Sequence, residues 1–143
     1  MRHLHVRTDR TSWATLGFSY GAWCAAFITM EHPEVFGAAI VIQGYFRPSF
    51  EASYSPYTPK ELRKFDLVRM AEFAPPPVAM WVFSSRQDAM SYPTTSRFLS
   101  VVKSPLDVSA TIVATGGHRP SVYQPFVASA FTWLGQTLPA FRA

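Results

Sequence analysis

A serine near the start of the chain stands in a pattern that can do nucleophilic chemistry. Residues 17–21 read Gly-Phe-Ser-Tyr-Gly, directly after a short apolar run and before a segment of small apolar residues. A serine on a sharp turn between a strand and a helix, a nucleophile elbow, is exposed for attack on a carbonyl. Gly17 and Gly21 are expected to let the strand and the helix approach without Cβ clashes. The pattern therefore predicts Ser19 as the nucleophile of an acyl-transfer reaction.

A serine nucleophile needs a general base, which a third group holds in place. His118 is the candidate base, because it lies on a Gly-Gly turn between the last predicted strand and the last predicted helix. The alternative for His118 is a turn histidine without a role. The other histidines are less suitable, because His3 and His5 precede the first strand and His32 lies at the end of a helix.

Asp88 is the candidate for the third group. It follows the apolar segment 78–83 and stands between Ser19 and His118 in the chain. The alternative is a loop aspartate that makes only a local turn hydrogen bond. Other carboxylates lie in helical segments, in a loop or at the wrong end of a strand: Glu51, Asp66, Glu72 and Asp107.

The segments that must position these residues alternate between strand and helix. Strands are predicted at 13–16, 36–42, 78–83 and 108–115, and helices at 22–30, within 60–73, at 93–103 and at 121–134. Two strands are continuously apolar, as buried parallel strands are, whereas the last one half-alternates like an edge strand. The sequence thus predicts one α/β domain over residues 1–143, with a mostly parallel sheet of about four strands flanked by helices.

The carboxyl ends of parallel strands are where such sheets bind ligands. Those ends carry Ser19, Gln43, the segment 84–88 and His118. Phe18, Gln43 and Tyr45 flank this edge and are predicted to contact substrate. The segment 45–59, rich in proline and aromatic residues, is predicted to be a loop that either overhangs the site or is held on the surface by its aromatic rings.

Three further patterns concern helix boundaries and burial. Thr58-Pro59-Lys60-Glu61 is a capping box with proline at the first helical position, which predicts a helix start. The segment 22–30 is apolar on nearly all sides, which predicts a buried helix and a buried Cys24 thiol. The last helix is predicted to gather apolar side chains on one face: Val122, Phe126, Val127, Ala130, Phe131 and Leu134.

The composition narrows the class of protein. The 143 residues are 48% hydrophobic with a formal net charge of +4, which allows a core, and no basic run indicates nucleic-acid binding. No apolar stretch reaches the roughly 18 residues of a membrane-spanning helix. Cys24 is the single cysteine, so neither an intrachain disulfide nor a cysteine-based zinc site is expected.

The serine chemistry needs no metal or organic cofactor. The first residues do not form a secretory signal. This is the only indication of a cytoplasmic location, and the location is otherwise open.

The segment from Arg10 to Gly44 resembles the esterase branch of the α/β-hydrolases, which includes S-formylglutathione hydrolases, feruloyl esterases, enterochelin esterases and mycolyltransferases. The features that match are Gly17-Phe18-Ser19-Tyr20-Gly21, His32-Pro33-Glu34-x-Phe36, the apolar strand that ends in Gly44, the segment 76–88 and the turn Gly117-His118. Ala22 and Gln43 depart from the pattern, since the family often has glycine and serine at these positions.

The resemblance implies a serine hydrolase that cleaves small carboxylic esters through an acyl-enzyme, with Ser19, Asp88 and His118 as the triad. It also implies that the backbone N–H of Tyr20 helps to bind the oxyanion. An acyltransferase of the same fold and a non-catalytic interaction module are the alternatives.

The position of the elbow serine, residue 19, is early for this family. The resemblance implies that the chain is a C-terminal portion that lacks the first half of the fold, including the loop with the second oxyanion donor. The strand 13–16 would then lie at an apolar edge of the sheet, and such an edge invites pairing with another chain. Three expectations stay open: a fragment of a longer protein, a start assigned too late, or a chain that completes itself by association through residues 13–16.

Overall fold

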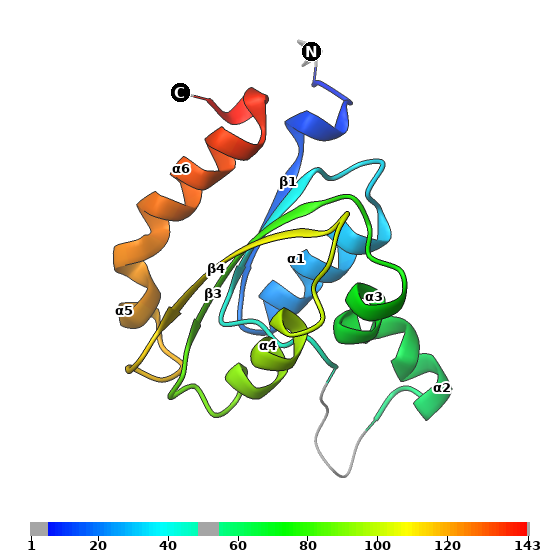
Figure 1. The fold of residues 1–143 in the computed structure, drawn as a ribbon, viewed down its shortest axis with the longest axis vertical. Helices are drawn as coiled ribbons and strands as arrows, with labels where there is room; N and C mark the ends of the chain where they lie inside the picture. Colours follow the sequence, from blue (N-terminus) through cyan, green and yellow to red (C-terminus); the bar gives the residue numbers. More distant parts are fainter. Residues whose placement is uncertain (1–5, 49–54, 143) are drawn as a thin grey trace, which may run out of the picture.

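Four parallel strands form one sheet in the computed structural model, which describes residues 6–48 and 55–142 (Figure 1). The strands are β1 Ala14–Phe18, β2 Ala38–Ile42, β3 Ala79–Ser85 and β4 Asp107–Val113, in the spatial order β1-β2-β3-β4. The helices are α1 Tyr20–Glu31, α2 Pro59–Leu62, α3 Leu67–Phe73, α4 Tyr92–Leu99, α5 Pro120–Tyr123 and α6 Val127–Thr137. Short 3₁₀ turns are η1 Arg10–Ser12, η2 Arg63–Phe65, η3 Gln124–Phe126 and η4 Pro139–Phe141. The predicted α/β class with about four mostly parallel strands is confirmed.

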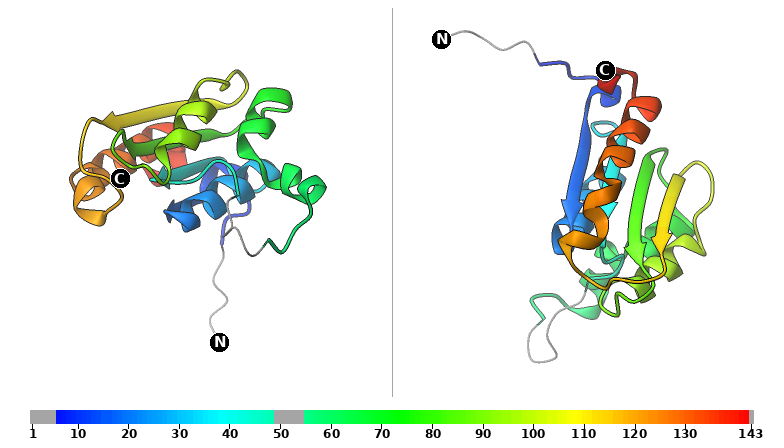
Figure 2. Two further views of the ribbon diagram at one scale, coloured as in Figure 1. Left: turned by 90° about the horizontal axis from the view of Figure 1, so that it is seen from below. Right: turned by 90° about the vertical axis from the view of Figure 1, so that its left-hand side faces the viewer.

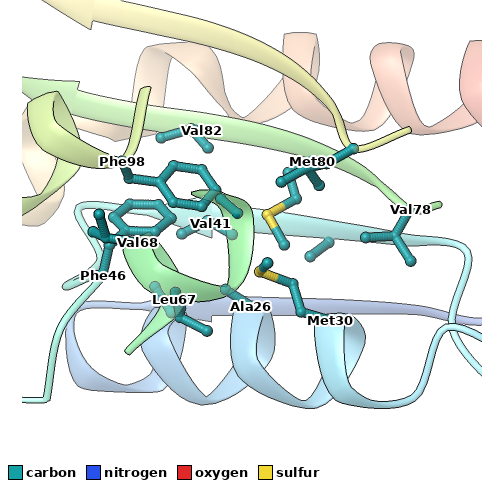
Figure 3. Close-up of a cluster of buried hydrophobic side chains, with 14 residues drawn as sticks. Ala26, Met30, Val41, Phe46, Leu67, Val68, Val78, Met80, Val82 and Phe98 are labelled. Atoms are coloured by element: carbon teal, nitrogen blue, oxygen red, sulfur yellow. The ribbon is translucent and has the colours of Figure 1, made fainter. Parts of the chain in front are cut away.

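Helices cover both faces of the sheet (Figure 2). On one face α1, α3 and α4 pack against alternate residues of β2 and β3, among them Val41, Met80 and Val82 (Figure 3). On the other face α6 packs against the intervening residues, such as Ile40 and Phe83. All five residues of β2 are buried, because this strand is covered by helices on both sides.

Local sequence signals account for two helix boundaries. The Thr58 side chain accepts a hydrogen bond from the Glu61 backbone N–H at 3.3 Å, and the Glu61 carboxylate accepts one from the Thr58 N–H at 2.8 Å. This is the predicted capping box, and α2 begins at Pro59. The predicted helix 121–134 is instead divided into α5, η3 and α6, because Pro125 has no N–H to continue a helix.

The surface of α1 corrects two predictions. Cys24 is exposed rather than buried, and Ile28 is 41% exposed. Ala22 and Ala26 on the opposite side of the helix are fully buried. A helix with apolar residues all round carries no periodicity that distinguishes its inner from its outer side, so packing alone decides. Phe131 of α6, predicted on the apolar inner face, is likewise 52% exposed.

Of the predicted loop 45–59, residues 49–54 lie outside the described residues, whereas the Phe46 side chain is fully buried. Within residues 6–48 and 55–142, no helix combines the length and hydropathy needed to cross a membrane.

Among residues 6–48 and 55–142, β1 pairs only with β2 and so lies at an edge of the described sheet. The Trp13 carbonyl accepts from Gly37 and the Ser19 N–H donates to Ile42, so the backbone groups of odd-numbered residues face β2. Backbone groups alternate in direction along a strand, so those of Ala14, Leu16 and Phe18 face away from the sheet. Leu16 is 53% exposed beside this edge.

We expect the chain to self-associate through the β1 edge, since pairing would satisfy these backbone groups and bury Leu16. A Leu16→Lys substitution should weaken the association by about 10-fold or more, because burying a leucine is worth about 1.5–3 kcal/mol. Sedimentation velocity over a concentration series measures this. Ser109→Lys on the opposite edge strand is the matched control. A monomeric wild-type chain, or equal weakening by both substitutions, would contradict the prediction.

Candidate active site

Ser19 lies on the sharp turn between β1 and α1. Its backbone has φ 57° and ψ −124°, a region that residues with a side chain rarely adopt. The turn is held from both sides: the Ser19 N–H donates to the Ile42 carbonyl at 2.9 Å, and the Ser19 carbonyl accepts from the Ala22 N–H at 3.1 Å. A Cβ on Gly17 would lie 2.1 Å from the Gly21 carbonyl oxygen, so only glycine fits there. The local structure is that of the predicted elbow.

Gly21 differs from the expectation. A Cβ at this position would meet no atom within 4 Å, so the side of Gly21 that faces outward is open. The prediction that both glycines prevent Cβ clashes is therefore correct for Gly17 and wrong for Gly21. The Gly21 carbonyl is the backbone group against which Gly17 packs.

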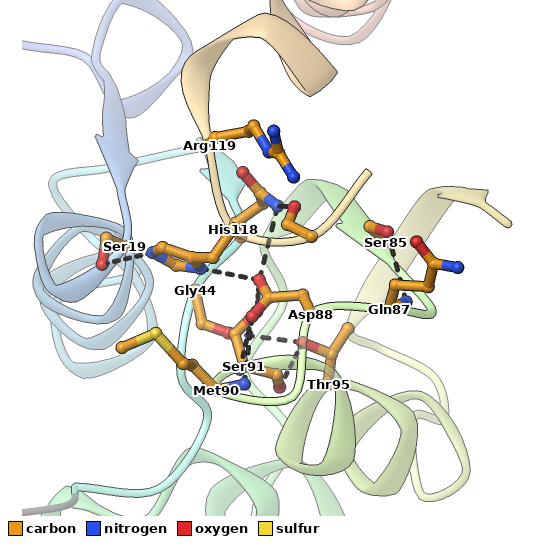
Figure 4. A network of polar contacts seen from close by, with 12 residues as sticks. Ser19, Gly44, Ser85, Gln87, Asp88, Met90, Ser91, Thr95, His118 and Arg119 are labelled. Carbon is orange, nitrogen blue, oxygen red and sulfur yellow. Dashed lines mark hydrogen bonds and ion pairs between the residues drawn. The ribbon is translucent and has the colours of Figure 1, made fainter. Parts of the chain in front are cut away.

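Ser19, His118 and Asp88 form one chain of hydrogen bonds (Figure 4). His118 Nε2 lies 2.8 Å from Ser19 Oγ, and His118 Nδ1 lies 2.7 Å from Asp88 Oδ2. A carboxylate can only accept, so Nδ1 carries the proton and Nε2 accepts from the serine hydroxyl. The structure thus brings together three residues, of which the first and the last, Ser19 and His118, are 99 positions apart in the sequence.

The Asp88 carboxylate is buried, and its side chain has 0% exposure. Oδ1 accepts from the backbone N–H groups of Met90 and Ser91, both at 3.1 Å, and Oδ2 accepts from the Ser91 hydroxyl at 2.5 Å. Burial alone would raise the pKa of Asp88, but hydrogen bonds from Ser91 and His118 outweigh it and hold the pKa below its ordinary value. Asp88 is therefore a stable anion at neutral pH.

Ser91 was not predicted as a site residue. An aspartate followed three residues later by serine, before a helix, is a recognisable pattern in which the carboxylate caps the next turn. The spacing of Asp88 and Ser91 in the sequence carries that signal. The additional hydroxyl bond to Oδ2 depends on the fold of the turn.

His118 follows two glycines with left-handed backbones, Gly116 at φ 119° and Gly117 at φ 70°. Side chains hold this turn. Gln87 Oε1 accepts from the Gly116 N–H at 3.1 Å, and the Arg119 Nε–H donates to the Gly116 carbonyl at 2.8 Å. The His118 imidazole is thereby placed over Ser19 with 15% of its side chain exposed.

Aromatic rings surround the imidazole. The Phe18 ring centroid lies 5.2 Å from that of His118 and 5.0 Å from that of Tyr123. The Tyr45 ring lies 6.3 Å from His118 and 5.5 Å from Tyr20. Phe18 and Tyr45 are therefore at the site and half-buried, and their predicted contact with substrate stays a prediction. Tyr123 is an aromatic neighbour that sequence reasoning missed.

Gln43 also lies at the site, but its side chain is fully buried. Its amide Nε2 lies 2.6 Å from the Gly117 carbonyl oxygen and 3.3 Å from Asp88 Oδ2. The predicted contact of Gln43 with substrate has no support in this placement, because the amide faces protein groups.

The arrangement can increase the nucleophilicity of a serine hydroxyl without an inorganic ion. Among the described residues, no three His, Cys, Asp or Glu side chains are grouped so that they could hold a metal. The Tyr20 N–H directly follows Ser19 at the N-terminus of α1, the end of a helix that carries partial positive charge. The geometry thus supplies a hydroxyl, an adjacent base, a buried anion and a positive helix end.

No protein-family model and no curated protein matches the sequence. Solved structures do match. An S-formylglutathione hydrolase from Agrobacterium tumefaciens aligns with a TM-score of 0.76 and 19% identity, over 94% of this chain and 52% of its own. A ferulic acid esterase aligns with a TM-score of 0.70 and 16% identity, over 94% and 54%. A dipeptidyl peptidase 4 from Porphyromonas gingivalis aligns with a TM-score of 0.71 and 17% identity, over 91% and 20%.

The described chain spans about half the length of the first two of these structures. All three are α/β-hydrolases, which share a parallel sheet and helices on its two faces. The chain therefore has the α/β-hydrolase fold over the part of these structures that it covers.

Proposed function

We propose that the protein is a serine hydrolase that cleaves carboxylic esters through an acyl-enzyme. The observation that carries the proposal is the hydrogen-bond chain from Asp88 through His118 to Ser19, at 2.7 Å and 2.8 Å. These are distances at which a base can accept the hydroxyl proton. The similarity of the fold to a hydrolase and an esterase supports the same proposal.

In the first step, Ser19 Oγ attacks the ester carbonyl carbon while its proton moves to His118 Nε2. The buried Asp88 carboxylate holds Nδ1–H and stabilises the imidazolium that forms. The proton then passes from Nε2 to the leaving alcohol oxygen as the C–O bond breaks. In the second step, water gives a proton to Nε2 and attacks the acyl carbon, and the acid leaves as Ser19 recovers its proton.

The Tyr20 N–H is proposed as one donor to the oxyanion of both tetrahedral intermediates. It belongs to the residue after the nucleophile, where the elbow geometry aims a backbone donor at the reacting carbonyl. Removal of a single oxyanion donor from an enzyme of this type costs on the order of 10²- to 10³-fold in turnover. The proposal thus assigns a backbone group, and side-chain substitutions at Tyr20 should leave this donor in place.

A fluorophosphonate probe tests the proposal, because it phosphonylates only an activated serine. We expect stoichiometric labelling of Ser19, located by peptide mass spectrometry, and no labelling of a Ser19→Ala variant. Ser109→Ala is the control, since it removes an exposed serine hydroxyl on the edge strand β4 and should label like the wild-type chain. Labelling that persists in Ser19→Ala, or a wild-type chain that does not react, would contradict the assignment.

A p-nitrophenyl ester and the matching p-nitroanilide then separate ester from amide cleavage. We expect release from the ester but none from the anilide above the Ser19→Ala background, because p-nitrophenoxide leaves without protonation whereas the anilide nitrogen must be protonated to leave. Acyl transfer uses the same acyl-enzyme, so products are also analysed in the presence of a primary alcohol. A transferase would form the new ester at the expense of the free acid.

A further inference from the structure

The Gln43 side-chain amide contacts two groups that position the His118 base, the Gly117 carbonyl and the Asp88 carboxylate. Its amide nitrogen lies 2.6 Å from the carbonyl oxygen of Gly117, the residue before His118. The same nitrogen lies 3.3 Å from Asp88 Oδ2, the oxygen that accepts from His118 Nδ1. A primary amide has two N–H groups, so one can point to each acceptor. The contact joins the end of β2 to the turn that carries the base and to the anion that orients it.

The surroundings of Gln43 indicate that these two hydrogen bonds, and not packing, account for a glutamine at this position. Gln43 has φ 47°, a left-handed backbone that is unfavourable for a residue with a side chain. Its Oε1 is buried without a hydrogen-bond partner among the described residues. An apolar side chain of the same volume would avoid an unpartnered acceptor. Packing alone therefore does not explain a glutamine here, whereas its two donors do.

The Gly116-Gly117 turn before His118 needs contacts that restrict its backbone conformation. Gly116 and Gly117 have no side chains, and a glycine pair has many accessible conformations. Gln87 and Arg119 bind the N–H and the carbonyl of Gly116, both from exposed positions. Gln43 is the fully buried side chain that binds the Gly117 carbonyl, directly before His118.

We propose that Gln43 is a positioning residue for the Asp88–His118 pair: one amide N–H fixes the Gly117 carbonyl, and the other shares the Asp88 oxygen to which His118 donates. It makes no contact with the reacting atoms. Its part in catalysis rests on the proposed function, but its effect on the His118–Asp88 hydrogen bond does not.

Gln43→Met tests the proposal, because it keeps the length of the side chain and removes both donors. We expect the downfield proton resonance of His118 Nδ1–H to broaden or move in this variant. The rate of Ser19 labelling should fall by roughly 10- to 100-fold at unchanged probe affinity, as expected for a small misplacement of a catalytic group. Ser84→Ala is the matched control, since the Ser84 hydroxyl is buried without a partner among the described residues. It should change neither readout.

Gln43→Glu is the second variant, chosen for its volume in case the first does not fold. When ionised, it places a carboxylate beside Asp88, which favours the protonated imidazole. The acidic limb of the pH profile for labelling should therefore move to higher pH. A wild-type Nδ1–H resonance in either Gln43→Met or Gln43→Glu overturns the proposal, even if thermal stability falls. If the wild-type chain does not label, the proposed function fails and the resonance alone decides the role of Gln43.

Discussion

His118→Ala should lower the rate of Ser19 labelling and of ester hydrolysis by on the order of 10⁴- to 10⁶-fold. The reason is the 2.8 Å contact between His118 Nε2 and Ser19 Oγ, which provides the base that accepts the hydroxyl proton. Without it, water must accept the proton. Initial rates with a p-nitrophenyl ester, corrected for the Ser19→Ala background, measure the loss.

His32→Ala is the control for this prediction. His32 caps the C-terminal end of α1 and pairs with Glu34 at 3.1 Å. At about 1.5 Å per residue, the 12-residue helix places it roughly 18 Å from Ser19. The substitution should leave the rate unchanged. Equal losses in both variants, or a His118→Ala variant that retains its rate, would contradict the assignment of His118 as the base.

Asp88→Asn should reduce the same rates by about 10⁴-fold, because an amide cannot hold His118 in the tautomer that accepts at Nε2. The pH dependence of stability provides a second readout. Folding lowers the pKa of Asp88 from 3.8, so its ionised form stabilises the fold above that pH. This contribution is lost as the pH falls through the lowered pKa. Unfolding free energies measured between pH 2 and about 5 should therefore depend less on pH in Asp88→Asn.

The order and position of the site residues could be predicted because each follows a strand. Ser19 follows β1, Asp88 follows β3 and His118 follows β4, and the strands are parallel. Their carboxyl ends must then lie at one edge of the sheet, where residues that are distant in sequence meet. The apolar runs that revealed β2 and β3 are strong signals, since few other structures need five consecutive buried residues.

Side-chain direction was not predictable in the same way. Gln43 follows β2 at the site edge, and its position alone is compatible with a contact to substrate. The left-handed backbone turns its amide inward, toward Gly117 and Asp88. Cys24 is exposed for a comparable reason, since an evenly apolar helix does not specify its outer side. Both features depend on tertiary contacts that a single sequence does not encode locally.

Gly17→Ala should destabilise the fold by about 3 kcal/mol or more, which corresponds to a melting temperature lower by roughly 10 °C. The added Cβ would lie 2.1 Å from the Gly21 carbonyl oxygen, 2.3 Å from its carbon and 2.6 Å from the Ala22 nitrogen. All three are backbone atoms, so no side chain can move aside. β1 and the first turn of α1 would have to separate, and urea unfolding monitored by circular dichroism measures the cost.

Gly21→Ala is the matched control, because it adds the same methyl group four residues later, where nothing lies within 4 Å. Alanine is also favoured over glycine in a helix by about 1 kcal/mol, so this variant should be as stable as the wild-type chain or more stable. Equal stability of both variants would contradict the packing argument. The expected contrast separates the two glycines of the Gly-x-Ser-x-Gly pattern: Gly17 permits the close approach of strand and helix that fixes the strained backbone of Ser19, and Gly21 provides the carbonyl against which Gly17 packs.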